Sequence, residues 1–242
     1  MTKRATAGLA GVLLLAGVLA GCGGDDDGDG GGGDGGGDFA DQSYADIKQD
    51  ALDAMTSLEA LHVQASVESE GQTSGLDISM SSEGSCTGNV QFGAASAEIL
   101  RTGDGAWYKP SAELLAQAFP DQAEEVVAHV GDSWVLDTDD EVTGSNCDLE
   151  SFIDQLSDDE EETDTEVVGV EELDGEDVVR LDYTNVDGDG SAYVLVEGEH
   201  YIVKIENKGE APGTATFSAF DDEVVVEAPA DDEVVDLAPF ES

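Results

Sequence analysis

Leu61-His62-Val63-Gln64-Ala65-Ser66-Val67-Glu68 places an apolar side chain at every second position. This alternation is typical of a strand that buries one face and exposes the other. The pattern returns in two later segments, at Leu76, Ile78 and Met80 and at Val90 and Phe92. The sequence therefore predicts a hairpin followed by a third strand, all of them half-buried and antiparallel.

Further strands are expected along the rest of the chain, at 97–100, 106–108, 134–136, 167–170, 178–183, 192–196, 201–205, 214–220 and 223–228. Several carry apolar residues on both faces, as in Tyr193-Val194-Leu195-Val196. Such a sheet must be covered on both sides or curl round something apolar. The acidic run 158–166 is expected to be a loop.

Three stretches show the helical spacing of three and four residues. The first is 44–58 behind a cap at Ser43, the second is 111–130, and the third is 149–156 behind a cap at Asp148. Pro120 divides the second stretch, because proline breaks a helix interior, and Asp121 is expected to cap its second half. A long antiparallel sheet with a few helices predicts the α+β class.

The N-terminal region predicts export and a lipid anchor. Lys3 and Arg4 precede an uncharged apolar run, 5–20. The segment Leu19-Ala20-Gly21-Cys22 stands at the end of this run. This layout is that of a secretory signal, and the cysteine at the cleavage site resembles the lipobox of bacterial lipoproteins. The resemblance implies a signal peptide at 1–21 and a diacylglyceryl group on Cys22, which would hold the protein on the extracytoplasmic face of the cell membrane. An uncleaved membrane anchor is the alternative.

The residues after Cys22 predict a tether. Only glycine and aspartate occur at 23–38, ten of the first and six of the second, and such a composition cannot bury a core. Residues 22–38 are thus expected to form a disordered spacer, and 39–242 a single folded domain.

The charge balance excludes one class of partner. The chain has 57 acidic and 8 basic residues and a formal net charge of −49. Nucleic-acid binding requires lysines and arginines that displace counterions, so no nucleic-acid partner is expected. Anionic lipid headgroups would also be repelled, and membrane attachment should depend on the acyl anchor. Binding of cations or of a basic partner is the alternative explanation for the acidity.

The remaining cysteines, Cys86 and Cys147, predict a disulfide, because an exported chain with an even number of other cysteines favours pairing. Free thiols or metal-binding thiols are the alternatives.

No motif predicts catalysis, and no enzyme activity or cofactor is expected. The three histidines do not fall in a metal-binding spacing. Residues 185–190 match the first positions of a calcium loop, but Val196 stands where a glutamate is needed, so a turn without metal is preferred. Trp107, Tyr108 and Trp134 could form a carbohydrate platform, although core packing is the favoured interpretation.

The order of the predicted segments along the chain resembles that of a known family. After the lipobox and spacer, an amphipathic helix runs into a strand at 57–63, and the later matching segments are 132–135, 168–181, 192–205, 217–220 and 224–229. The chain resembles the actinobacterial LprG/LppX-type lipoproteins, which share the LolA/LolB-like fold. The resemblance spans nearly all of the mature domain through patterns of strand and turn.

This resemblance implies a strongly curved antiparallel sheet, an unclosed half-barrel, with helices packed on its concave side. It also implies a cavity between sheet and helices that binds, and perhaps transports, an acyl chain of a lipid or lipoglycan. A monomer is expected. The alternative is a membrane-anchored interaction or sensory module without lipid cargo. The candidate cavity residues, for each of which plain core packing is the alternative, are Leu76, Ile78, Met80, Val90, Phe92, Ile99, Phe152 and Leu156.

Overall fold

The computed structural model describes residues 39–240 except 139, 141, 145, 158–161, 187 and 210. The expected signal peptide, Cys22 and the tether 22–38 lie outside the described residues, as does Asp187 of the calcium-like turn.

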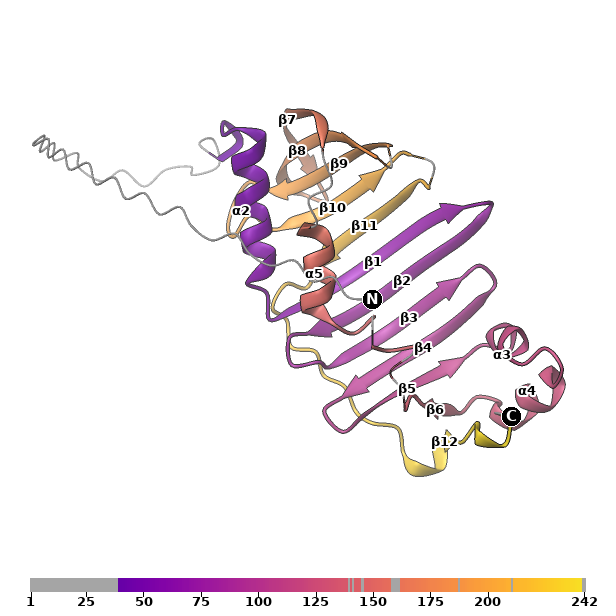
Figure 1. Cartoon of the computed structure of the whole chain (residues 1–242). Coiled ribbons are helices and arrows are strands. Elements are labelled where there is room, and N and C mark those ends of the chain that lie inside the picture. Colours follow the sequence, from indigo (N-terminus) through magenta and orange to yellow (C-terminus); the bar gives the residue numbers. More distant parts are fainter. Residues whose placement is uncertain are drawn as a thin grey trace, which may run out of the picture. The chain divides into compact units, whose positions relative to one another are not determined.

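Twelve strands of the described chain form one sheet (Figure 1). Their spatial order is β12-β6-β5-β4-β3-β2-β1-β11-β10-β9-β8-β7, so β7 and β12 are the two edges and the sheet is not closed. Neighbours are antiparallel except for β6 and β12, which are parallel. The strands are β1 (Ala60–Ser69), β2 (Gln72–Ser81), β3 (Cys86–Phe92), β4 (Ala95–Thr102), β5 (Gly105–Pro110), β6 (Trp134–Leu136), β7 (Thr163–Leu173), β8 (Glu176–Asn185), β9 (Gly188–Leu195), β10 (Ile202–Asn207), β11 (Gly213–Ser218) and β12 (Val234–Val235).

Four helices complete the described α+β fold, namely α2 (Tyr44–Thr56), α3 (Ala112–Ala118), α4 (Ala123–Val130) and α5 (Leu149–Ser157). In Figure 1, α2 and α5 lie next to each other against the sheet, and α3 and α4 lie beside β5 and β6. The expected α+β class with a curved, unclosed antiparallel sheet is confirmed.

Local chemistry explains where α2 and α5 begin. The Ser43 hydroxyl accepts a hydrogen bond from the Asp46 backbone N–H at 3.3 Å, which satisfies one free donor of the first turn. The Asp148 carboxylate accepts from the Ser151 backbone N–H at 3.0 Å. This hydrogen bond is the main reason why the pKa of Asp148 lies below its ordinary value.

One core joins α2 and α5 to the sheet. Ile47, Ala51 and Met55 are buried on one side of α2, because residues four apart lie on the same face of a helix. They pack against alternate residues of the strands, among them Val63 and Ile78. We call this helix-covered side of the sheet the inner face and the opposite side the outer face. A second, smaller core contains Leu115, Val126, Val130, Val135 and Leu237.

A disulfide joins Cys86, at the start of β3, to Cys147, two positions before α5. Their Cα atoms are 5.4 Å apart, and both residues are buried in the main core. The bridge therefore ties the beginning of α5 to the middle of the sheet.

Three local expectations are wrong. Residue Gln122, rather than Asp121, precedes α4, and it makes no side-chain capping bond. Residues 223–228 form no strand. Val225 in this segment is exposed, and the chain instead pairs later, where β12 runs beside β6. The strand β7 already begins at Thr163, within the run expected to be a loop.

Candidate ligand-binding pocket

The rows of side chains across the inner face change in size toward one end of the strands. Val63 of β1 pairs with Phe217 of β11, and the ring of Phe152 on α5 lies 6.2 Å from the Phe217 ring. The next pair in this direction is Ala65 with Ala215, and the pair after that is Val67 with Gly213. The Phe217 and Phe152 rings thus fill the space under α5 at the first row, whereas two alanines in the second row and a glycine in the third leave space.

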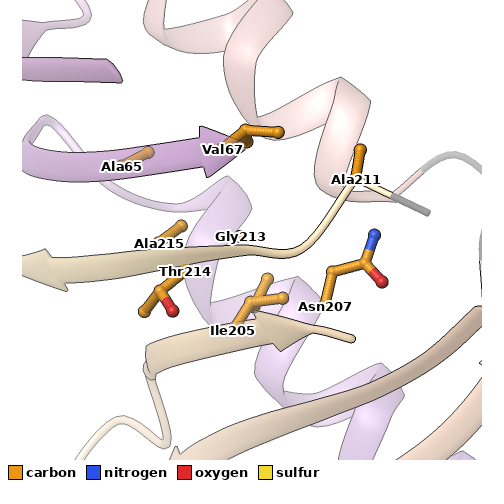
Figure 2. A pocket seen from close by; sticks show the side chains of 8 residues that line it. All are labelled: Ala65, Val67, Ile205, Asn207, Ala211, Gly213, Thr214 and Ala215. Carbon is orange, nitrogen blue, oxygen red and sulfur yellow. The ribbon is translucent and has the colours of Figure 1, made fainter. Parts of the chain in front are cut away.

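A pocket of about 480 Å³ lies over these small residues. Figure 2 shows that its lining comes from three neighbouring strands, with β11 between β1 and β10, and from Ala211 in the loop before β11. Its size is within the usual range for small-molecule sites. The lining residues are Ala65, Val67, Ile205, Asn207, Ala211, Gly213, Thr214 and Ala215.

The pocket continues the main core. Ala65, Ile205 and Ala215 are partly buried and pack against that core, whereas Val67, 41% exposed, lies toward solvent. A hydrocarbon chain placed here would have core side chains at one end and water at the other.

An aromatic side chain of β8 lies over β9, the strand next to β10, on the same side of the sheet. Gly190 of β9 pairs with both Asn207 and Tyr183, and a side chain at position 190 would overlap the Tyr183 ring. Glycine therefore allows this ring to lie flat on β9, beside the residues that line the pocket.

A polar cluster connects α2 to the residue just before β7. The Tyr44 hydroxyl donates to the Glu162 carboxylate at 3.0 Å, and the Lys48 ammonium lies 3.0 Å from the same carboxylate oxygen. Burial, and then the negative charge of Glu162, raise the pKa of Tyr44 above its ordinary value. Tyr44 is consequently a neutral donor at physiological pH.

The outer face carries polar pairs. His62 lies 2.8 Å from the Asp77 carboxylate, and this hydrogen bond is the main cause that lowers the pKa of Asp77. Arg180 contacts Asp182 at 2.7 Å, and Lys204 contacts the Glu206 carboxylate at 2.6 Å. These three basic side chains thus have carboxylate partners within the sheet.

The eight residues expected to line a cavity lie elsewhere on the inner face or in α5. Ile78, Met80, Val90 and Ile99 are fully buried in the main core. Leu76, Phe152 and Leu156 are partly buried against it. Phe92, at the end of β3, is 55% exposed. None of the eight is among the residues that line the pocket over β1, β10 and β11.

The pocket-lining residues were not predicted from the sequence. Large apolar side chains mark a packed core, whereas space arises where the side chains are small. Ala65, Ala215 and Gly213 occupy successive inner-face positions of paired strands, and a row of small residues on the buried face is the signal that could have located the pocket.

A larger hollow of about 770 Å³ lies toward the β12 edge of the sheet, between β5, β6 and the C-terminal segment. Its lining includes Trp107 and Leu136 together with the carboxylates Asp137, Asp231 and Asp236. Carboxylates in the lining disfavour an apolar occupant, and the smaller inner-face pocket is the more apolar of the two. Among the described residues, no cluster of three or more histidine, cysteine, aspartate or glutamate side chains could hold a metal ion.

The fold was compared with solved structures. LprF from Mycobacterium bovis superimposes with a TM-score of 0.56 and 15% sequence identity, covering 76% of this chain and 96% of LprF. The chain has the fold of LprF. The lipoprotein LppX of Mycobacterium tuberculosis gives a TM-score of 0.49 at 15% identity, covering 76% of this chain and all of LppX (100%).

A LolA superfamily protein from Nitrosomonas europaea gives a TM-score of 0.25 at 11% identity, covering 79% of this chain and 96% of that protein. No protein-family model and no curated protein matches the chain by sequence. The described part of this LprF-like chain contains no helix long and apolar enough to cross a bilayer.

Proposed function

We propose that this protein binds a single acyl chain of a lipid in the inner-face pocket, while a lipid group on Cys22 anchors it to the extracytoplasmic face of the cell membrane. The observation that carries the proposal is the apolar pocket over Ala65, Val67 and Ala215, which continues the core of an LprF-like open sheet.

The volume of the pocket supports one chain rather than several. A methylene group is comparable in size to a water molecule, which occupies about 30 Å³ in the liquid, so about 480 Å³ corresponds to roughly 16 such groups. Each buried methylene contributes about 0.8 kcal/mol. A fully seated chain would thus contribute on the order of 10 kcal/mol before the cost of ordering the ligand.

The tether supports the same function. The r.m.s. reach of a 16-residue glycine-rich chain is about 22 Å, and the six aspartates at 23–38 repel one another and extend it. A domain held at this distance could collect a lipid from the membrane surface without being drawn onto anionic headgroups, because the chain as a whole has a net charge of −49.

The first test is mass spectrometry of solvent extracts from the purified protein, combined with a variant that fills the pocket. Leucine at position 215 would project between Ala65 and Ile205, which pair with Ala215 on either side. We expect Ala215→Leu to lose the co-purifying lipid and to weaken binding of a pyrene-labelled fatty acyl ester at least tenfold.

Ala118→Leu is the matched control, because it adds the same side chain at an exposed position of α3 outside the pocket. Its lipid content should equal that of the wild type. A wild-type protein that carries no lipid and binds no labelled chain would instead favour the interaction module without cargo.

A further inference from the structure

The rim of the pocket contains a side-chain amide with a defined orientation. Asn207 ends β10 and is partly buried. Its Oδ1 accepts a hydrogen bond from the backbone N–H of Gly209 at 3.0 Å, which fixes the two ends of the amide, since only the oxygen can accept. The Nδ2 group then points toward the pocket on the side of Ala211 (Figure 2).

An amide N–H at the rim of an apolar pocket constrains the ligand. A ligand that covers this N–H donor without accepting a hydrogen bond from it loses about 1–3 kcal/mol of binding free energy. A bound lipid must therefore place an acceptor oxygen at this position. The acyl chain would lie over Ala65 and Ala215, and the oxygen at its head would lie at Asn207.

The surrounding charges decide which kind of oxygen fits. The loop after β10 is attached to β1 by a hydrogen bond from the Glu68 backbone N–H to the Pro212 carbonyl at 2.9 Å. Glu68 and Glu206 each follow or precede an inner-face residue by one position, so their side chains project from the outer face, where Lys204 pairs with Glu206. Lys208 is the basic residue nearest to Asn207 in the sequence. None of the residues that line the pocket is a lysine or arginine, so an anionic head would be buried without a charged partner, which is costly. The net charge of the chain, −49, also disfavours an anion.

We propose that Asn207 is a specificity-determining residue whose side-chain N–H donates a hydrogen bond to an uncharged carbonyl or hydroxyl oxygen of the ligand. This proposal rests on the proposed lipid-binding function. The site therefore selects esterified or otherwise neutral lipids over free fatty acids of the same chain length.

The test compares the methyl ester and the free acid of one pyrene-labelled fatty acid, bound to the full-length chain carrying Cys22→Ser at neutral pH. The two probes differ only in the head that would meet Asn207. We expect the wild-type pocket to prefer the ester on the order of tenfold.

The informative variant is Asn207→Asp. Aspartate keeps the acceptor for the Gly209 N–H, so the turn should fold unchanged, but it removes the donor and adds a charge. Ester affinity should fall on the order of tenfold, with an unchanged melting temperature. Asn89→Asp is the matched control, because it adds the same charge at an exposed position of β3, and its ester affinity should equal that of the wild type.

The outcomes separate the two proposals. Equal wild-type affinity for ester and acid, or undiminished ester binding by Asn207→Asp, would overturn the role of Asn207 while leaving lipid binding intact. Failure of both probes to bind the wild type would overturn the lipid-binding function, and the role of Asn207 with it.

Discussion

Removing the disulfide should destabilise the fold by an amount that the structure allows us to work out. Cys86 and Cys147 are separated by 61 positions in the sequence. For a loop of this length, the loss of chain entropy in the unfolded state gives about 4 kcal/mol near 25 °C. Both residues are almost completely buried, at 0% and 2% exposure, so alanine at either position would also lose packing with the core.

Equilibrium urea unfolding, followed by tryptophan fluorescence, is the suitable assay. We expect the Cys86→Ala/Cys147→Ala double variant to lose about 4 kcal/mol of unfolding free energy, and the wild type to lose a similar amount when a reductant is added. The double variant should not respond to the reductant. This insensitivity is the internal control, because it shows that the reductant acts only through the bridge.

A functional consequence follows from the position of the bridge. Cys147 lies just before α5, whose Phe152 contacts Phe217 at the inner end of the pocket. Loosening this attachment should weaken binding of the labelled ester under conditions where the protein is still folded. If the double variant unfolded within about 1 kcal/mol of the wild type, the entropic argument would be refuted.

Three further changes test other parts of the structure. Asp77→Asn should lower the unfolding free energy by less than about 1 kcal/mol at neutral pH, because the pair with His62 is exposed. Since the Asp77 pKa is lowered in the fold, that stabilisation is present above the ordinary carboxyl pKa and lost as the pH falls through the folded value, so urea titrations of both proteins should converge at acidic pH. Asp137→Ala should cost about 3 kcal/mol by chemical denaturation, because a buried carboxylate would no longer accept its three hydrogen bonds from the following loop. Phe217→Ala should lower the unfolding free energy by about 3–5 kcal/mol and increase binding of longer labelled chains, since the ring that it removes ends the pocket beneath Phe152.

The strands and helices were largely predictable from local patterns. The alternation from Leu61 to Glu68 indicated β1, and Ser43 and Asp148 indicated the starts of α2 and α5, because capping and periodicity depend on residues close in sequence. The segment 223–228 shows where local patterns fail. Its valines alternate as in a strand, but the central strand β11 already pairs with β1 and β10, which leaves no free neighbour there.

The position of the pocket could not be predicted in the same way, because empty space depends on two elements at once. A row such as Ala65 with Ala215 creates a pocket only if no helix side chain reaches over it. Phe152 reaches the row of Val63 and Phe217, and the register between helix and sheet that determines this is absent from either segment alone. Phe152 therefore lies on the same side of the sheet as the pocket, one row away from Ala65 and Ala215. Asn207 could not be predicted as a ligand contact for the same reason. An asparagine at a hairpin turn is common, and it becomes a candidate only because the small residues Ala65 and Ala215 leave space beside it.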